Sequence, residues 1–425
     1  MDDKPLLAVV YSPRSKPWWE IAEAAGAVCR LLWIADETAL GTTARVLRKL
    51  GKVIDTAGLM EEDLVAAVRA QHPDGVTCYV DKDLPRQAVL TTALGLPGPA
   101  VDAVTRLNDK LLQRQALEAA GLPVPRFTPI KDNLDSVEID RLCQTLRFPM
   151  LIKPRQGTAS RDIVPIADRE ELVSTLEDVA RPSEMILEER MADTPSPDPS
   201  ADQVSVDTVA SSGTLSHLGI LGFFPIAPPF RLSGCFFPAD LPRSEVPELF
   251  ALAAACIQAI GADTGCFRTE IKRTPHGWKI IEINGRPSGV TPALVQLASG
   301  VPVLELNMRL ALGERVTVEG PVPCDRISYR YFSQPPTSAV TVSVISRLND
   351  LRERAGVLDI DVFKEIGDPV DWRNGSLDRV FQVTGTVANY AELAEHFRAC
   401  SADSFVAYEH QLQNEPSVAS ARRVG

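Results

Sequence analysis

The sequence predicts a mixed α/β (α+β) protein that starts with an open α/β sheet lobe and ends with a small β-rich lobe. Residues 1–100 alternate short apolar runs such as LLAVVY with helical stretches, which is typical of βαβ units. FPMLIKPRQGTASRDIVPIA (148–167) reads as a strand, a glycine-bearing loop and a second strand. CFRTEIKR (266–273) and GWKIIEING (277–285) read as the two strands of a hairpin.

The chain has 425 residues, which is enough for two to four domains. The turn-rich run LGLPGP (94–99) separates the first lobe from the rest. We expect four parts, namely residues 1–100, 101–185, 186–315 and 316–425. The last dozen residues, NEPSVASARRVG, have the composition of a mobile tail.

The composition is that of an ordinary globular protein, with 45% hydrophobic and 24% charged residues. A net charge of -12 argues against a broad nucleic-acid or anionic-membrane surface. No apolar run approaches the roughly 18 residues of a membrane span, and the run in MDDKPLLAVVY is too short for a signal peptide. The eight cysteines form no CxxC pair and the five histidines are dispersed, so we expect reduced thiols, no structural zinc and a cytoplasmic location.

The elements after the first lobe have readable ends. We expect a helix within residues 106–127, capped by Asn108 or Asp109 and closed by Gly121. EMILEERM (184–191) is predicted to be a strand. Neither GxGxxG nor GxxxxGK[ST] occurs, so a Rossmann dinucleotide site and a P-loop lack their usual sequence support.

The hairpin carries polar residues at alternate positions. With a three-residue loop, Pro275-His276-Gly277, Glu270 falls opposite Glu282 and Arg268 opposite Asn284. The other face is then apolar and suits a core; it holds Phe267, Thr269, Ile271, Ile281 and Ile283.

Two directly opposed carboxylates repel each other, and a divalent cation removes that conflict. Oxygens of two Glu and one Asn suit Mg²⁺. The alternative is a solvated polar face on which Lys272 and Arg268 neutralise the acids. A two-residue loop would put the two acids on opposite faces.

The order and spacing of these segments resemble the ATP-grasp superfamily, and within it the carboxylate–amine ligases of the L-amino-acid (dipeptide) ligase type. The resemblance covers nearly the whole chain. It makes residues 101–185 and 186–315 the small and large ATP-grasp subdomains, and GDPVDWRNGSLDRVFQVTGTVANYAEL (367–393) resembles the terminal module of those ligases.

The resemblance implies an ATP site and a metal site, both carried over residue by residue. It implies that ATP is bound by Lys110, Lys153, Gly157, Thr158, Ala159, Ser160, Glu188, Glu189, Met191 and Gln203. In this set the two lysines meet phosphates, the loop 156–162 folds over them, Glu188 and Glu189 form the adenine hinge, and Gln203 stands at the ribose position. The implied metal ligands are Glu270, Glu282 and Asn284, and the implied catalytic residues are Arg286 and Lys153. Ala159 and Asp162 depart from the pattern, because glycine is common there.

The implied substrate residues are Arg286, Ser288 and Gly289, together with Asp83 in the loop DKDLPRQ (81–87). Leu232 and Cys235 stand where many dipeptide ligases carry a Glu and a His that line the amino-acid pocket. A pocket without the acid binds an α-ammonium group poorly. We therefore hypothesise that the activated substrate is not an ordinary α-amino acid. Arg231 favours an additional carboxylate if it points inward, and is otherwise a rim residue.

The resemblance implies formation of an amide, in a dipeptide-like or amide metabolite, through an acyl phosphate, with release of ADP and phosphate. It implies ATP, two Mg²⁺ ions for which Mn²⁺ could substitute, and small carboxylate and amine substrates. It also allows a homodimer. One alternative is a carboxylase or formyl-adding enzyme of nucleotide metabolism, for which Arg14, Lys16 and Arg86 are the candidate phosphate contacts. Another is a non-catalytic ATP-binding protein.

Overall fold

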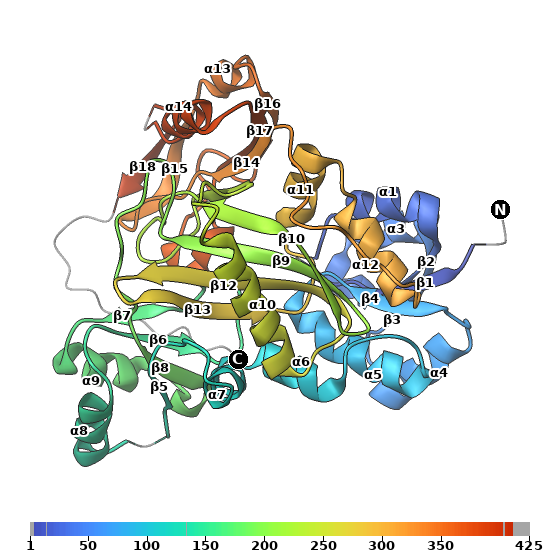
Figure 1. The fold of residues 1–425 in the computed structure, drawn as a ribbon, viewed down its shortest axis with the longest axis horizontal. Helices are drawn as coiled ribbons and strands as arrows, with labels where there is room; N and C mark the ends of the chain where they lie inside the picture. Colours follow the sequence, from blue (N-terminus) through green and yellow to red (C-terminus); the bar gives the residue numbers. More distant parts are fainter. Residues whose placement is uncertain (1–3, 14, 133, 403, 411–425) are drawn as a thin grey trace.

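The computed structural model describes residues 4–410 except 14, 133 and 403. It contains a parallel sheet, a small antiparallel sheet, a large antiparallel sheet and a two-stranded ribbon. Figure 1 shows the parallel sheet and its helices in blue on the right, the small sheet at the lower left, and the last part of the chain at the top. The predicted tail and Arg14 lie outside the described residues.

The N-terminal sheet is parallel, with strand order β3-β2-β1-β4. Its strands are almost wholly apolar because helices cover both faces. One face packs against α1 and α12, and the other against α4, α5 and α6. The strands are β1 (Leu6–Val10), β2 (Arg30–Ala35), β3 (Gly51–Asp55) and β4 (Gly75–Cys78). The helices of this part are α1 (Trp18–Val28), α2 (Glu37–Leu40), α3 (Thr42–Leu50), α4 (Glu61–Arg69), η1 (Asp81–Asp83), α5 (Leu84–Leu94) and α6 (Val101–Asn108).

The helix expected within residues 106–127 is α7 (Lys110–Ala119). Asp109 is its cap, because its carboxylate accepts hydrogen bonds from the N–H groups of Leu111 and Leu112 at 2.9 and 3.3 Å. Asn108 instead ends the preceding helix α6. Gly121 follows α7 in the left-handed conformation, with φ of 71°.

The small sheet has the order β5-β8-β6-β7 and is antiparallel. Helices α8 and α9 cover one face around Met150, Ile152 and Leu187. The elements are β5 (Phe127–Pro129), α8 (Ser136–Thr145), β6 (Met150–Pro154), β7 (Val164–Ile166), α9 (Arg169–Asp178), η2 (Pro182–Glu184) and β8 (Met185–Glu189).

The large sheet has eight strands in the order β13-β12-β9-β10-β11-β14-β17-β16. Helix α10 packs on the apolar face of β9, β10, β12 and β13, where its small residues allow close approach. The strands are β9 (Gln203–Ser211), β10 (Thr214–Phe223), β11 (Gly234–Phe237), β12 (Gly265–Thr274), β13 (Gly277–Asn284), β14 (Ile327–Phe332), β16 (Val357–Val362) and β17 (Phe381–Val387). The three strands after residue 316 thus continue the sheet that begins at residue 203.

The remaining elements are α10, further helices and the two-stranded ribbon of β15 and β18. Helix α12 reaches back to the N-terminal sheet, where Met308 and Ala311 pack. The elements are α10 (Val246–Ile260), α11 (Thr291–Ser299), α12 (Val303–Ala311), β15 (Ala339–Ile345), α13 (Leu348–Arg352), η3 (Trp372–Leu377), α14 (Tyr390–Cys400) and β18 (Val406–His410). None of the helices in the described residues has the length and apolar character needed to cross a membrane.

Candidate active site

Strands β12 and β13 form the expected hairpin, but by a different turn. Thr274 pairs with Gly277, so the loop has two residues and the predicted three-residue loop is wrong. A β-bulge at Ile281 then shifts the register by one residue, and Glu270 lies opposite Glu282 after all. The bulge also places Ile280 in the core, where the sequence predicted Ile281; Ile280 is fully buried and Ile281 is half-buried.

The polar face of the hairpin brings Glu270, Glu282 and Asn284 together. The Asn284 amide donates to Glu282 Oε1 at 3.2 Å, and Gln203 on β9 donates to Glu270 Oε2 at 3.1 Å. Arg268 lies 3.3 Å from the other oxygen of Glu270. The two carboxylate side chains are only 15% and 26% exposed, so this is not an open solvated face.

The two carboxylates differ in their surroundings. Burial, opposed by Arg268 and reinforced by Glu282, raises the pKa of Glu270 above its ordinary range. Burial acts the same way on Glu282, but Lys110 and the Asn284 amide hold the pKa of Glu282 below its ordinary value. Two close carboxylates, one of which resists ionisation, form a donor set that fits a divalent cation. The described residues contain no cluster of three or more His, Cys, Asp or Glu, so such an ion would rely on these two acids, the Asn284 oxygen and ligand oxygens.

Lys110 lies beside this face at the start of α7. Its ammonium donates to the carbonyl of Gly157 at 2.8 Å and lies 3.6 Å from Glu282. The structure therefore joins the helix, the loop 156–162 and the hairpin through one side chain.

Lys153 at the end of β6 belongs to a buried charge triad. Its ammonium lies 2.5 Å from Glu188, and the Arg114 Nε lies 2.8 Å from the other oxygen of Glu188. The side chains of Lys153, Glu188 and Arg114 are 7%, 2% and 1% exposed. Burial lowers the pKa of Lys153 to about 8, although Glu188 raises it. The sequence reasoning missed Arg114, which the four-residue spacing from Lys110 on one helix face could have revealed.

Glu188 and Glu189 are placed differently from the expected hinge. Strand β8 lies between β5 and β6, so the backbone of Glu188 is flanked on both sides. The Glu189 N–H donates to Arg126, and the Arg190 N–H donates to Pro149. Met191 is the first residue beyond the strand whose N–H has no partner among the described residues. Within the described part of this segment, a backbone N–H without a protein partner is therefore first found at Met191 rather than at the two glutamates.

The loop 156–162 adopts the conformation that the missing glycines would favour. Ala159, Ser160 and Asp162 have positive φ angles of 60°, 58° and 56°. Gly157, with φ of 159°, precedes them, and Thr158 accepts a hydrogen bond from the Arg161 N–H. Three residues with positive φ within a stretch of four need support from elsewhere in the fold.

That support comes from the turn of η3 near the end of the chain. The Ser376 N–H donates to the Ala159 carbonyl at 2.9 Å. A Cβ on Gly375 would lie 2.0 Å from the same carbonyl oxygen, and Gly375 itself has φ of 68°. Only glycine fits there. The Ser376 hydroxyl accepts from the N–H of Leu232, so the turn also holds the segment before β11.

Arg286 follows β13 and pairs with Asp81 in η1. Its Nε and Nη2 lie 3.0 and 2.6 Å from Asp81 Oδ2. The predicted substrate residue Asp83 instead accepts from the Ser12 hydroxyl at 2.7 Å and is buried. The structure therefore places Arg286 against Asp81, a residue of the same loop that the sequence analysis did not single out.

Ser288 and Gly289 continue the loop after Arg286. The Ser288 hydroxyl donates to Thr291 at 2.6 Å, and the Gly289 carbonyl accepts from the Lys16 ammonium at 2.8 Å. Lys16 also pairs with Glu20 at 2.9 Å and is buried. Lys16 therefore has two protein partners, whereas Arg86 is exposed on α5.

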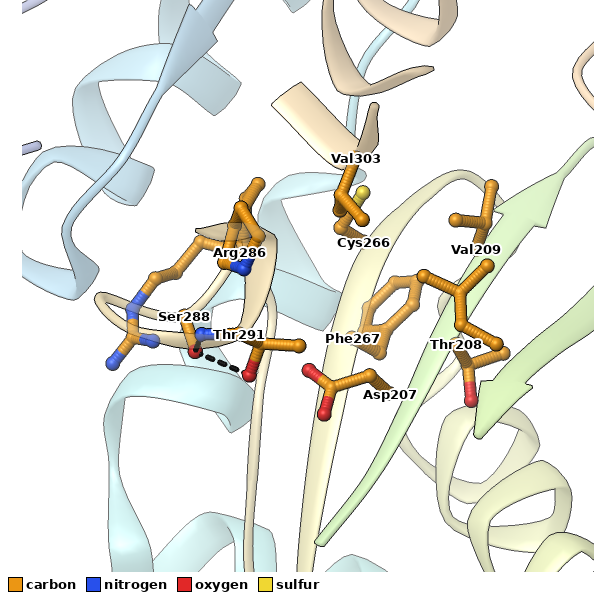
Figure 2. A pocket seen from close by; sticks show the side chains of 12 residues that line it. Asp207, Thr208, Val209, Cys266, Phe267, Arg286, Ser288, Thr291 and Val303 are labelled. Carbon is orange, nitrogen blue, oxygen red and sulfur yellow. Dashed lines mark hydrogen bonds between the residues drawn. The ribbon is translucent and has the colours of Figure 1, made fainter. Parts of the chain in front are cut away.

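Figure 2 shows a pocket between this loop and strands β9 and β12, with the Ser288–Thr291 hydrogen bond at one side and Asp207 facing it. The space between its lining atoms, which is partly open to solvent, is about 230 Å³. Asp207 is 6% exposed, and its Oδ2 has no hydrogen-bond partner within the described part of the chain. Burial raises the pKa of Asp207 to about 6, although Arg268 lowers it. Sequence reasoning missed this acid, although it alternates with Gln203 and Ser205 along one strand face.

Arg231 is turned toward the backbone rather than toward a substrate. It is 2% exposed, and its guanidinium donates to the carbonyls of Pro228 and Pro335 at 2.6 to 2.8 Å. The geometry lends no support to a substrate role for Arg231. Cys235 on β11 is buried and lies opposite Arg330 on β14.

No family model matches the sequence. An uncharacterized protein of Sinorhizobium fredii is 25% identical over 318 residues, which are 72% of this chain and 62% of that relative, less than two thirds of its length. A D-alanine–D-alanine ligase of Pseudomonas putida is 24% identical over 239 residues, covering 54% of this chain and 72% of the ligase.

Solved structures resemble nearly the whole chain. An L-amino acid ligase of Bacillus licheniformis matches with a TM-score of 0.77 and 20% identity, over 97% of this chain and 100% of the ligase. The N5-carboxyaminoimidazole synthetase of Staphylococcus aureus complexed with ADP matches with a TM-score of 0.72 and 14% identity, over 93% and 96%.

Proposed function

Because this chain has the ATP-grasp fold and belongs to the superfamily that includes the carboxylate–amine ligases, we propose that it is an ADP-forming ligase that joins a carboxylate to an amine. The observation that carries the proposal is the meeting of Glu270, Glu282 and Asn284 on one hairpin face. Lys110 lies at one side of them, and Arg286 follows two residues after the end of β13.

The reaction that suits this face has two steps. A carboxylate oxygen of the substrate forms a bond to the γ-phosphorus of ATP, and the bond to the β–γ bridging oxygen breaks, releasing ADP. The nitrogen of a neutral amine then attacks the acyl carbon, inorganic phosphate leaves with its electron pair, and the nitrogen loses a proton to water. Both steps depend on positioning and charge neutralisation.

Each residue of the site has a proposed role. Lys110 and Lys153 bind phosphate oxygens, the N–H groups of the loop 156–162 cover them, and Met191 binds the base edge. Arg286 stabilises the transferring phosphoryl group, since a planar, permanently charged fork suits that task. Mg²⁺ held by Glu270, Glu282 and Asn284 would neutralise phosphate charge. Gln203 keeps Glu270 in place, and Glu188 keeps Lys153 in place, through the contacts described above.

The finer features stay predictions. They are the dipeptide-like or amide product, the number of metal ions, the cytoplasmic location, a homodimer and the four-part division of the chain. A carboxylase of nucleotide metabolism is the second candidate, because a carboxyaminoimidazole synthetase shares the fold. Lys16, one of its expected phosphate contacts, is already engaged by Glu20 and Gly289.

A phosphate-release screen tests the proposal. Purified protein, ATP and Mg²⁺ are incubated with pairs of acids and amines, with separate wells for bicarbonate and formate, and products are identified by mass spectrometry. ATP turnover that requires both an acid and an amine supports the ligase. Turnover with bicarbonate or formate alone supports the second candidate, and ADP binding without turnover supports a non-catalytic role.

The substitution Arg286→Met separates catalysis from nucleotide binding. A ligase loses kcat by about 100-fold or more while the Kd for ADP changes little, because the arginine acts on the transferring group. Arg273→Met on the same hairpin is the control, since Arg273 stacks on Trp278 at 4.5 Å and lies at the far end of the strand. Equal losses in kcat and in ADP affinity on Arg286→Met would contradict the assigned role.

A further inference from the structure

Arg330 on the large sheet and Arg379 just before its strand β17 have no carboxylate partner in the described part of the chain. Among the described residues, no Asp or Glu oxygen lies within 4 Å of Arg330 on β14 or of Arg379 just before β17. The other cations near the site do have one: Arg286 pairs with Asp81, Arg268 with Glu270 and Lys16 with Glu20. Positive charge is therefore balanced at the phosphate end of the site but not here.

Arg330 lies on the same face of the sheet as the hairpin acids. Phe223, Cys235, Arg330 and Thr384 are register partners along four neighbouring strands, so their side chains share one face. The guanidinium of Arg268 lies 5.3 Å from the centre of the Phe223 ring. Arg330 stands two strands beyond Phe223, which is about 10 Å at ordinary strand spacing.

Lys16 links Arg330 electrostatically to the loop that follows Arg286. Its ammonium donates to the Gly289 carbonyl at 2.8 Å, and the charges of Arg330 and Arg286 both act on it. Burial is the main cause that lowers the pKa of Lys16, Glu20 raises it, and Arg330 and Arg286 lower it further. An acid whose one carboxylate meets Arg286 could thus extend toward Arg330.

Arg379 is held in place beside Arg330. Its guanidinium lies 4.6 Å from the Phe332 ring and 4.7 Å from the Phe363 ring, and Phe332 is two residues from Arg330 on the same strand face. Its Nε has no hydrogen-bond partner among the described residues. Burial, then the charge of Arg330, lowers the pKa of Arg379 to about 10, with Asp361 acting the other way.

The donors that remain point to an anionic ligand. Arg330 uses only its Nε, which donates to Thr384 at 3.0 Å, and no protein partner is found for its two terminal nitrogens within the described chain. The amide of the buried Gln382 already donates to the Asp361 carboxylate, so it is not one of the remaining donors. Two neighbouring, half-buried guanidinium groups repel each other. An anion removes that repulsion and accepts hydrogen bonds from the N–H groups of both.

We propose that Arg330 and Arg379 bind a second anionic group, a carboxylate or a phosphate, on the acid that this protein activates. The proposal rests on the ligase function above and names its substrate class: an acid with two anionic ends, one phosphorylated near Arg286 and the other held by the two arginines. It also moves the extra-carboxylate role from Arg231, whose guanidinium holds backbone carbonyls, to residues that the sequence reasoning had not singled out.

Binding to the Mg²⁺–ADP form provides the first test. The probes are glutarate, 3-phosphonopropionate and the monoamide of glutarate, which has the same length with one neutral end. We expect the dianions to bind at least about tenfold more tightly than the monoamide, as a charge-assisted bidentate contact gives. Binding of one dianion only identifies which anion the arginines accept. Dianions that bind no better than the monoamide, or do not bind at millimolar concentration, overturn the proposal.

Variants locate the effect. Arg330→Gln should remove the preference for a dianion, and Arg330→Lys should restore part of it. Arg326→Gln is the matched control, because Arg326 is 51% exposed and pairs with Asp325 next to the same strand. An unchanged preference in Arg330→Gln overturns the proposal, and equal ADP affinity of all variants shows that they fold.

ADP release with hydroxylamine as the acceptor keeps the two hypotheses apart. Dianions that bind without supporting ADP release leave the anion site standing and count against the ligase. Turnover of monocarboxylic acids by a protein that does not bind dianions leaves the ligase standing and removes the anion site.

Discussion

Replacing Glu188 by glutamine tests whether the buried triad is as tightly coupled as its geometry indicates. The change keeps the shape of the side chain but removes the one negative charge between Lys153 and Arg114. Both cations are more than nine-tenths buried, and among the described residues the only other acceptor for Arg114 is the Ile281 carbonyl. Removal of one partner from such a pair costs about 3–5 kcal/mol in the free energy of unfolding.

The loss should depend on pH through Lys153. In the native protein, burial lowers the pKa of Lys153 to about 8, although the charge of Glu188 raises it. The variant lacks that charge, so the pKa of Lys153 falls further. The folded variant then releases the proton at lower pH than the native protein does. The variant's loss in the free energy of unfolding is therefore largest at about pH 6 and smaller at about pH 8, because a neutral Lys153 no longer repels Arg114.

Urea denaturation of the ligand-free protein at the two pH values measures both effects. Glu184→Gln is the control, since Glu184 is 63% exposed and pairs only with exposed Arg181, and it should change stability by less than about 0.5 kcal/mol. A loss below about 1 kcal/mol at both pH values would refute the reasoning. It would mean that Lys153 and Arg114 find water or other acceptors without cost.

Two further changes test the cap of α7 and the support of the loop 156–162. Asp109→Ala removes both the cap of α7 and the 2.5 Å contact with Arg155. It should therefore lower the free energy of unfolding by more than Asp135→Ala, which removes only the cap of α8 and typically costs about 1 kcal/mol. Equal losses in the two variants would show that the Arg155 contact contributes nothing. Gly375→Ala should lower ADP affinity about tenfold, because its Cβ would lie 2.0 Å from the Ala159 carbonyl oxygen. The control Gly367→Ala has open space around it and a φ of 94°, so it should change stability but not ADP affinity. An unchanged Kd for ADP in Gly375→Ala would show that the loop does not need the turn.

The hairpin shows how far the sequence could go. Alternation of polar and apolar residues predicted two strands and one polar face, and the opposed acids were found as expected. The route to them was wrong, because a two-residue loop and a bulge give the same pairing as a three-residue loop. The wrong loop length and the missed bulge each shift the register by one residue, and the two shifts cancel. Short-range sequence patterns do not distinguish a three-residue loop from a two-residue loop with a bulge.

Residues whose partners are distant in sequence were the hardest to place. Asp81 lies 205 residues from Arg286, and Gly375 supports a loop more than 200 residues earlier. Nothing near Arg231 in the sequence showed that its guanidinium would meet Pro335. The cap of α7 depends on a few adjacent residues, and there the prediction was met.

Ser376 acts on two segments that belong to different sides of the site. Its N–H donates to the carbonyl of Ala159 in the loop 156–162, and its hydroxyl accepts from the N–H of Leu232, just before the strand β11 that pairs with the strand of Arg330. In the proposed site, one residue therefore holds both the loop 156–162 over the nucleotide and the segment before β11 on the acid side. We expect a movement of the loop that releases ADP to break the Ser376 contacts, so that the nucleotide side and the acid side open together.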